Sequence, residues 1–338
     1  RLNVHSAFTG LDIVVLIAYI VGVTALGTWL GGTQRGARDY FLAGRELPWW
    51  AICFSVVATE TSALTFISIP ATAYTSDFWF LQLAAGYLIG RIAIAWLLLP
   101  RYFSGELVTA YQLLERRFGL GARRFTSVIF MVTRAFADSV RVFAAAIPIA
   151  LITGLPYWQS IVLAGVVTVI YTYYGGLRAV IWIDVVQMGL YIFGGAVALY
   201  VLTQLVPGGW GGIAETARAA DKFRVIHLEG GFASGRWLIT GLIGGAFLSM
   251  ASHGVDHLIV QRLLAAGNLE SARKALIGSG IVVFAQFTLF LAVGIGLYAY
   301  YGGRAFDVPD EIFPLFIVEG LPPGISGLIV AGILAAMM

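Results

Sequence analysis

Charged side chains are scarce in this sequence. Asp, Glu, Lys and Arg together make up 12% of its 338 residues, whereas 59% are hydrophobic. Soluble domains usually carry about a quarter charged residues, so the composition excludes an ordinary soluble protein. The net charge is only +3, and no basic domain indicates nucleic-acid binding. Apolar runs near the ~20 residues of a bilayer-spanning helix recur, and the alternating segments of a lipid-facing barrel are absent. We therefore expect an all-α integral membrane protein.

Cysteine and histidine are also rare. Cys53 is the only cysteine, so an intrachain disulfide is excluded. Two of the four histidines lie in HGVDH, where His253 and His257 stand at i and i+4 beside Asp256. That spacing can place metal ligands on one helix face, which leaves an intramembrane metalloenzyme as an alternative. Because no third strong ligand lies nearby in the sequence, we favour a polar cavity lining formed by His253 with Ser249 and Ser252.

Nine hydrophobic segments are separated by Gly, Pro and charged residues. With the N-terminus outside, the inner loops carry twelve Lys and Arg residues, Arg262 among them, and the outer segments carry six, Lys222 among them. The excess of positive charge on the inner side predicts a multi-pass protein of the cell (inner or plasma) membrane with its N-terminus outside. The segments are 11–32, 49–73, 80–100, 125–153, 157–174, 179–206, 237–260, 277–300 and 323–338.

The two ends of the sequence suggest part of a longer chain. The sequence starts at Arg1, and no cleavable signal precedes the first apolar run. Residues 323–338 would form about 24 Å of helix, less than the ~30 Å hydrocarbon core. We therefore expect the natural chain to continue past Met338. The preceding EIFPLFIV, residues 311–318, is predicted to be a short helix at the outer surface.

Ionisable residues at membrane depth are costly and tend to mark pathways or binding sites. Arg134, Asp138 and Arg141 are four and three residues apart, so they share a helix face. They form either a structural ion-pair ladder or a gate or ligand for an anionic or polyhydroxyl solute. Asp184 is either paired with a loop arginine such as Arg178 or an ion ligand. Arg91, about halfway along its segment, needs a buried partner or snorkels to the interface.

The stretch VVATETSALTF, residues 56–66, puts four hydroxyls and Glu60 inside an apolar segment. Ser and Thr compete for backbone hydrogen bonds and favour local unwinding. An interrupted helix frees carbonyls for a small cation and a half-helix N-terminus for a polar solute. The seventh segment has a comparable zone, GLIGGAFLSMASHG at 241–254. Two interruptions five segments apart predict two inverted five-helix repeats with the site between them.

Five further motifs occur in a recognisable order. With them, the sequence resembles the sodium/solute symporter family, which includes sodium–glucose and sodium–sialic acid transporters. The resemblance implies a LeuT-type fold in one transporter domain, 1–338: a leading helix at 11–32, a first repeat at 49–206 and an incomplete second repeat at 237–338. The motifs are DYFLAGRELPWWA (39–51), ATETSALTFISIPATAYTSD (58–77), TAYQLLERRFG (109–119), IYTYYGGLRAVIWIDVVQ (170–187) and IVQRLLAA (259–266).

The resemblance also implies a sodium site. The backbone carbonyls of Ala58 and Thr61 match two of the family's ligands, and Ala335 matches a third carbonyl on the last helix. The family's remaining ligands, a pair of hydroxyls, would lie just beyond Met338. Asp184 matches a carboxylate that some members use for a second sodium ion. No cofactor other than Na⁺ as the coupling ion is expected.

Positions for the solute follow from the same resemblance. Ser62 and Thr65 match solute-facing positions after the interruption, Phe80 matches an outer aromatic gate, and Gln82 lies near a polar contact. Three further sets are more distant matches. Ser249 and Ser252 replace an amide and an inner-gate tyrosine of the sugar transporters, and Arg134 lies one turn from the position of a carboxylate-binding arginine in the sialic acid branch. Asp138 and His253 complete the candidate solute contacts.

We therefore predict a sodium-coupled symporter, not an enzyme, that imports a small polar organic solute such as a sugar, a sialic acid or a small carboxylate. The partners would be the solute, Na⁺ and the bilayer, and the oligomeric state stays open. A proton-coupled carrier with Glu60 or Asp184 titrating is the first alternative, and a sensor without transport activity is another. Glu60 itself has three interpretations: a proton site, a charge partner of Arg134, or a solute contact.

Overall fold

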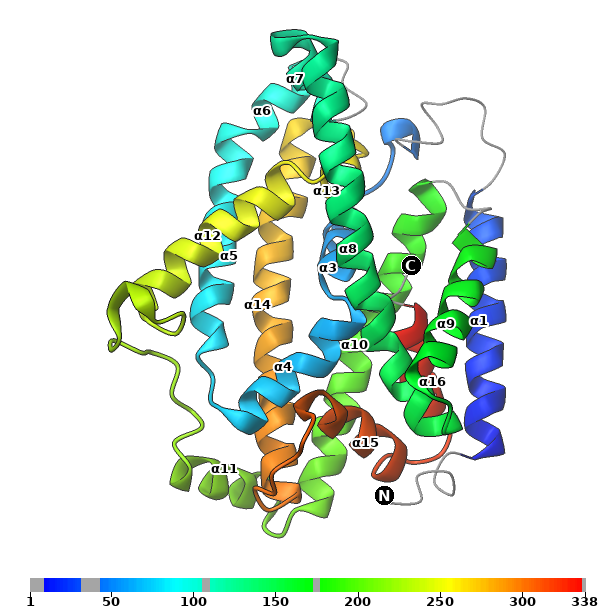
Figure 1. Cartoon of the computed structure of the whole chain (residues 1–338), viewed down its shortest axis with the longest axis vertical. Helices are drawn as coiled ribbons and strands as arrows, with labels where there is room; N and C mark the ends of the chain where they lie inside the picture. The colour runs from blue at the N-terminus through cyan, green and yellow to red at the C-terminus, as the bar shows by residue number, and fades with distance from the viewer. Residues whose placement is uncertain (1–8, 32–42, 105–109, 173–176, 336–338) are drawn as a thin grey trace.

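The computed structural model describes residues 9–31, 43–104, 110–172 and 177–335 of the chain (Figure 1). The long helices follow the apolar runs, and no strand is formed within these ranges. The elements are α1 (Gly10–Gly31), η2 (Ala43–Arg45), α3 (Trp49–Glu60), α4 (Ala63–Thr75), α5 (Phe80–Leu97), α6 (Leu99–Phe103), α7 (Ala110–Phe118), α8 (Leu120–Thr153), α9 (Tyr157–Thr172), α10 (Leu177–Leu205), α11 (Gly209–Ala219), η3 (Gly231–Ala233), α12 (Leu238–Gly254), α13 (His257–Leu264), α14 (Leu269–Tyr300), η4 (Pro309–Glu311), α15 (Ile312–Glu319) and α16 (Ile325–Ala335).

Four stretches of helix are long and apolar enough to cross a membrane: Gly10–Gly27, Phe80–Phe103, Leu177–Leu205 and Leu269–Tyr300. Two helix pairs pass the same test but are sharply bent, α3 with α4 and α12 with α13. The described residues thus contain up to six spans. The other predicted segments form α8, α9 and α16. On α8, large apolar side chains such as Phe125, Met131 and Phe136 are exposed, as expected of a helix that faces lipid.

The core lies around α14, which packs against α3, α4, α5 and α10. Phe66 of α4 is fully buried at the centre of an aromatic cluster. Its ring centroid lies 5.0 Å from that of Phe290, 5.1 Å from Phe313 and 5.2 Å from Tyr191. Burial of large aromatic side chains is among the strongest packing contributions. The cluster therefore fixes α4 against α10, α14 and α15 just beyond the bend between α3 and α4.

Glycines bring α5 and α12 into close contact. A Cβ on Gly86 would lie 2.5 Å from the Leu242 carbonyl oxygen, and one on Gly90 would lie 2.4 Å from that of Ala246. Only glycine allows backbones to approach this closely. The prediction that the glycines of 241–254 interrupt the helix is therefore wrong, because α12 continues to Gly254. The bend follows at 255–256, and the glycines serve helix packing instead.

The leading helix is tied to α16 by one carboxylate. Asp12, in the first turn of α1, is fully buried and accepts hydrogen bonds from the backbone N–H groups of Gly324 (2.7 Å) and Gly327 (2.9 Å). These donors lie at the N-terminus of α16, where backbone N–H groups have no partner within the helix. Asp12 therefore caps α16, which was not predicted from the sequence.

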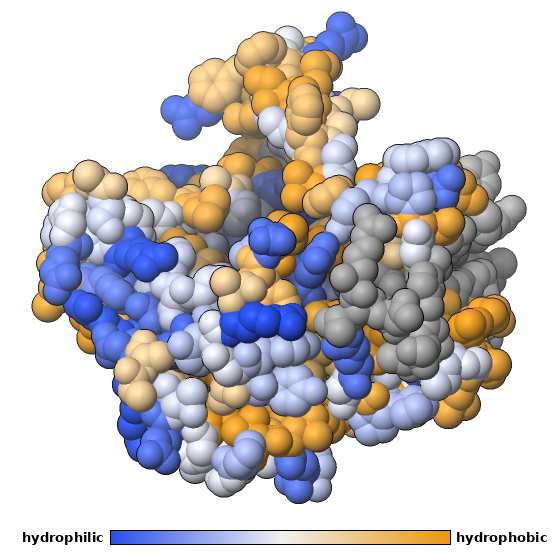
Figure 2. Space-filling view, turned by 60° about the horizontal axis from the view of Figure 1, so that its bottom comes forward, coloured by the Kyte–Doolittle hydropathy of each residue, from blue (hydrophilic) through white to orange (hydrophobic). Residues whose placement is uncertain are grey.

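The connecting elements gather at two ends of the bundle. In Figure 1, α6 and α7 lie at one end, and α11 and α15 lie at the other, with the start of α1. Figure 2 shows hydrophilic side chains among hydrophobic ones on the face that carries this second end. The predicted short helix at 311–318 is confirmed as α15, and its position at the outer surface of the membrane stays a prediction. Its side chains from Ile312 to Val318 are buried, because the helix packs against α4, α8, α14 and α16.

Candidate functional site: the α3–α4 break

The predicted interruption in 56–66 is confirmed. Helix α3 ends at Glu60, α4 begins at Ala63, and the two helices are bent by 68°. The Thr61 N–H still bonds to the Val57 carbonyl at 2.7 Å, but the Ser62 N–H turns to the Glu60 carbonyl at 2.9 Å. The Ala58 carbonyl thereby loses the partner that a continuous helix would supply. Thr59 donates its hydroxyl to the Ser55 carbonyl at 2.8 Å, an alternative bond of the kind that weakens a helix.

Two backbone carbonyls are left open at this break. Within the described chain, no hydrogen bond ends on the carbonyl oxygen of Ala58 or of Thr61. The Thr61 side chain is fully buried and donates its hydroxyl to Gln286 Oε1 of α14 at 2.9 Å, which holds the break against the core. Buried carbonyls without partners are costly, and backbone oxygens are suitable ligands for a small cation. Ala335, the third predicted carbonyl, is the last residue of α16.

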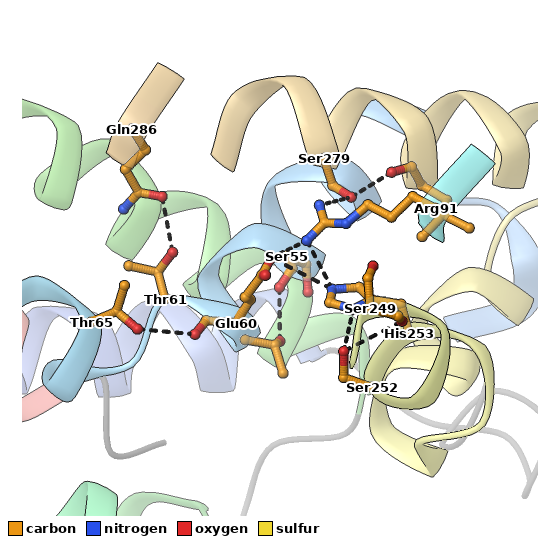
Figure 3. Close-up of polar contacts among 12 residues, drawn as sticks. Ser55, Glu60, Thr61, Thr65, Arg91, Ser249, Ser252, His253, Ser279 and Gln286 are labelled. Carbon is orange, nitrogen blue, oxygen red and sulfur yellow. Dashed lines mark hydrogen bonds and ion pairs between the residues drawn. The ribbon is translucent and has the colours of Figure 1, made fainter. Parts of the chain in front are cut away.

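Beside the break lies a cluster of charged residues, shown in Figure 3. Glu60 forms an ion pair with Arg91 of α5, whose side chain is fully buried. Arg91 also donates to Ser279 Oγ of α14 at 2.7 Å. The suggestion that Glu60 pairs with Arg134 is therefore wrong. For Arg91, the buried-partner interpretation is confirmed and snorkelling is wrong, because the side chain does not reach a surface.

His253 of α12 completes this cluster. Its Nε2 lies 3.1 Å from Arg91 Nη2 and 3.5 Å from Glu60 Oε2, and its Nδ1 lies 2.8 Å from Ser252 Oγ. Because a guanidinium nitrogen can only donate, the shorter contact assigns Nε2 as an acceptor and Nδ1 as the protonated nitrogen. His253 is then neutral and supports Arg91. The Ser249 hydroxyl, one turn earlier on α12, is buried and has no partner among the described residues.

A second ion pair lies beside Ser55, earlier in α3. Asp184 of α10 accepts hydrogen bonds from Ser55 of α3 and from Arg262 of α13, with Arg262 Nη2 at 3.1 Å. All three residues are buried. The predicted pairing of Asp184 with Arg178 is therefore wrong: Arg178 is exposed at the start of α10. Counting Arg262 among the inner-loop charges was also wrong, because it lies within α13.

The ion pairs of the ladder predicted on α8 are confirmed, and the alternative role of these residues as a gate or solute ligand stays a prediction. Arg134 Nε lies 3.0 Å from Asp138 Oδ2, and Arg141 Nη1 lies 3.6 Å from Asp138 Oδ1. The Asp138 side chain is 46% exposed, so the packing within the chain does not enclose these pairs. Arg141 also donates to the Thr59 carbonyl at 3.4 Å, so the ladder contacts the last turn of α3, next to the break.

The other predicted solute contacts lie around α5 and the break. Phe80 packs edge-to-face on Phe287 of α14, with centroids 5.2 Å apart. Gln82 is buried, its Nε2 donates to the Arg236 carbonyl at 2.9 Å, and its Oε1 accepts from the His227 N–H at 3.2 Å. Both ends of the Gln82 amide are therefore held by the backbone of 227–236. The Thr65 hydroxyl lies 3.5 Å from the Glu60 carbonyl (Figure 3).

The HGVDH motif does not form the predicted helix face. His253 belongs to α12 and His257 to α13, and the two helices are bent by 66° at the residues between them. Asp256 caps α13 by accepting from the N–H groups of Leu258 and Ile259, and the His257 ring stacks on Tyr111. No group of three or more metal-binding side chains occurs in the part of the chain that the structure describes. The metalloenzyme alternative thus loses the geometry on which it was based.

Two buried contacts were missed. Gln286, on the apolar helix α14, accepts the hydrogen bond of Thr61. Its side-chain amide in a long apolar run was a sequence signal for a buried polar contact at membrane depth. Lys222 was counted as an outer loop charge, but its side chain is buried and donates to the Tyr74 carbonyl at 2.7 Å and the Ser76 carbonyl at 3.0 Å. Burial lowers the pKa of this ammonium group. Lys222 thus binds the carbonyl end of α4.

Comparisons with known proteins agree with this arrangement. The model of the sodium:solute symporter family matches residues 40–338. The chain belongs to the sodium:solute symporter family. It is 33% identical to the sodium/sialic acid symporter NanT of Aliivibrio fischeri over 98% of this chain and 66% of that protein. It is 26% identical to the sodium/glucose cotransporter of Vibrio parahaemolyticus, over 99% and 66% of the two chains.

The fold also matches a solved structure of a sodium-coupled sialic acid symporter in its substrate-bound outward-open state. The TM-score is 0.86 and the identity 30%, with 98% of this chain and 70% of that chain covered. The predicted all-helical, LeuT-type fold of a membrane transporter family is therefore confirmed. The chain spans about two thirds of NanT and, at 27% identity, about half (52%) of the human sodium/iodide cotransporter. The division into a leader and two repeats stays a prediction, with which the two bent pairs agree.

Proposed function

We propose that this protein is a sodium-coupled symporter that imports a small polar organic solute across the cell membrane, with its N-terminus outside. The observation that carries this proposal is the pair of open carbonyls of Ala58 and Thr61 at a bent, buried helix break. They occur in a chain whose named relatives transport sialic acid or glucose together with sodium.

In this mechanism, Na⁺ binds the carbonyls of Ala58 and Thr61, with Ala335 as a further ligand from α16. Binding satisfies the open carbonyls and orders the residues between α3 and α4. The solute then contacts Ser62 and Thr65 at the start of α4. Sodium and solute promote each other's binding because both favour the ordered break, and this reciprocal linkage is what couples their transport. Relative motion of the bent pairs would then open the opposite side of the bundle.

The structure favours sodium over proton coupling. A proton-coupled carrier would use Glu60 or Asp184, the two carboxylates predicted for that role. Glu60 is paired with Arg91 and Asp184 with Arg262, and both arginines are buried. Protonation of either carboxylate would leave a buried guanidinium without its counter-charge, which is strongly unfavourable. Asp184 as a ligand for a second sodium ion remains compatible with this proposal.

The first test uses Na⁺ alone as the probe. We expect NaCl to raise the melting temperature of the purified protein in a saturable way, because a ligand that binds only the folded state stabilises it. Choline chloride at equal ionic strength is the control. Proteoliposomes are then assayed for uptake of N-acetylneuraminic acid and D-glucose under an imposed sodium or proton gradient. Equal effects of NaCl and choline chloride, or uptake driven only by protons, would contradict the proposal.

A further inference from the structure

The Glu60 carboxylate is held through only one of its two oxygens. Oε2 contacts both Arg91 and, at 3.5 Å, His253. Oε1 accepts no hydrogen bond from the residues that the structure describes, and the side chain remains 15% exposed. Glu60 lies between the break residues Thr61 and Thr65 on one side and His253 on the other (Figure 3). An open carboxylate oxygen is therefore available for a hydrogen-bond donor beside the break.

The groups that hold Glu60 are themselves fixed. Arg91 is fully buried and bonds to Ser279 at 2.7 Å, while His253 supports the same guanidinium at 3.1 Å. These contacts come from α5, α14 and α12, so three helices determine where the carboxylate of α3 lies. A side chain fixed in this way needs little ordering when a ligand binds, which favours affinity and selectivity.

The charge of the cluster indicates which donor fits. Glu60 carries one negative charge, Arg91 one positive charge, and His253 is neutral in the tautomer assigned above, so the cluster is balanced. A carboxylate or an ammonium group beside it would add an uncompensated charge in a buried place, which is costly. A hydroxyl group adds no charge and can donate to Oε1.

Two other buried groups near the break also lack a partner. They are the Ser249 hydroxyl, 1% exposed, and the Gln286 Nε2 amide, on a residue that is 2% exposed. The amide is a donor, whereas a hydroxyl both donates and accepts. A solute with hydroxyls can donate to Glu60, whereas a solute with only acceptors cannot.

We propose that Glu60 is a specificity-determining residue of the solute site, where Oε1 accepts a hydrogen bond from a hydroxyl of a polyhydroxylated solute. Arg91, His253 and Ser279 are positioning residues that hold the carboxylate. This inference rests on the proposed symport function. It selects within the predicted solute range: sugars and sialic acids are accepted, whereas a monocarboxylate without a hydroxyl is disfavoured at this position.

The test measures equilibrium binding to the full chain in saturating NaCl. The polyhydroxylated probes are D-glucose, myo-inositol and N-acetylneuraminic acid, and the probe without hydroxyls is propionate. We expect at least one polyhydroxylated probe to bind at least tenfold more tightly than propionate. In Glu60→Gln, we expect its affinity to fall at least tenfold. Glu115→Gln is the matched control, because Glu115 of α7 also pairs with an arginine, Arg123, but both side chains are partly exposed. The affinity of this variant for the same probe should stay within twofold of wild type.

Glu60→Gln leaves Arg91 without a counter-charge, so Glu60→Gln/Arg91→Gln serves as a second, charge-balanced variant. We expect the same loss of affinity there, with the sodium-induced thermal shift retained. The positioning role predicts that Arg91→Lys lowers the ratio of affinities for the best polyhydroxylated probe and propionate, whereas general damage would weaken both equally.

The inference is overturned if no polyhydroxylated probe binds wild type better than propionate, or if both Gln variants bind with unchanged affinity. Absence of a sodium-induced rise in the melting temperature of wild type would instead refute the proposed function. The two failures are therefore distinguishable.

Discussion

The chain contains two helix breaks of nearly equal bend, 68° between α3 and α4 and 66° between α12 and α13, but their polar groups differ. At the second break, Asp256 accepts from the N–H groups of Leu258 and Ile259, and the Gly254 carbonyl accepts from the Tyr102 hydroxyl at 2.7 Å. At the first break, Ser62 occupies the corresponding cap position without a capping bond. Two carbonyls of that break have no partner in the described chain.

The difference shows that a bend alone does not mark a binding site. Breaking a helix frees backbone groups at any position, and they must find partners in the protein, in water or in a ligand. At the α12–α13 break, the first N–H groups of α13 and the Gly254 carbonyl find partners within the chain. At the α3–α4 break, the Ser62 hydroxyl caps no N–H group of α4. The capping of the second half-helix is therefore what distinguishes the two bends.

The largest expected effect comes from Arg262, which links the two breaks by binding Asp184 of α10 and Ser55 of α3 from α13. Arg262→Met leaves the buried Asp184 without its counter-charge. We expect the free energy of unfolding to fall by about 3–5 kcal/mol, the usual cost of breaking a buried ion pair. Chemical denaturation in detergent micelles measures it.

Two variants test the cause of this loss. Arg262→Met/Asp184→Asn should recover more than half of it, because no buried charge remains unpaired. Arg178→Met is the matched control at the exposed arginine and should stay within about 0.5 kcal/mol of wild type. If Arg178→Met were as damaging as Arg262→Met, the assignment of the ion pair would be wrong.

The second effect concerns the contact that holds the open break. Thr61→Val keeps the shape of the side chain but removes its hydrogen bond to Gln286 Oε1, leaving a buried amide with no partner. We expect a loss of about 1–3 kcal/mol in the free energy of unfolding and a weaker sodium-induced thermal shift. Thr288→Val is the control, because its exposed hydroxyl bonds only within α14. If the sodium-induced thermal shift of Thr61→Val equalled that of wild type, the hydrogen bond between Thr61 and Gln286 would not contribute to sodium binding.

What the sequence could predict depended on the range of the interaction. The ladder of Arg134, Asp138 and Arg141 was predicted because helix geometry alone places these residues together. The α3–α4 break was predicted because its hydroxyls compete locally with the helix. The partners of Glu60 and Asp184 are 31 and 78 residues away, on helices whose packing no local pattern specifies. The partners suggested from the sequence, Arg134 for Glu60 and Arg178 for Asp184, were therefore wrong.

The second break shows the same limit. Its existence in the seventh segment was predicted from glycine and serine content, but the position was wrong. Gly241 and Gly245 contact α5 closely, because Gly86 and Gly90 present a matching surface. A glycine that permits helix packing and one that ends a helix look alike in a single sequence. The distinction requires knowledge of the surface that the glycine faces.

The third effect tests the capped break between α12 and α13. Asp256→Ala removes the side-chain cap of α13, which should cost about 1 kcal/mol of unfolding free energy. Because the proposed sodium ligands at a helix break belong to α3–α4, the sodium-induced thermal shift should equal that of wild type. Asp256→Asn retains a capping oxygen and should restore most of the stability. A sodium shift abolished by Asp256→Ala but not by Asp256→Asn would mean that both breaks take part in sodium binding.

The smallest expected effect on stability is at Ser62, and it sharpens the comparison most. Ser62 begins α4 without a capping bond from its hydroxyl, so Ser62→Ala removes no stabilising contact. We expect the free energy of unfolding to stay within about 0.5 kcal/mol of wild type, while the affinity for the best-binding polyhydroxylated probe falls. Asp256→Ala should show the reverse, lower stability with unchanged affinity. If Ser62→Ala instead lost stability and kept its affinity, the first break would be a structural corner like the second, and the solute site would have to lie elsewhere.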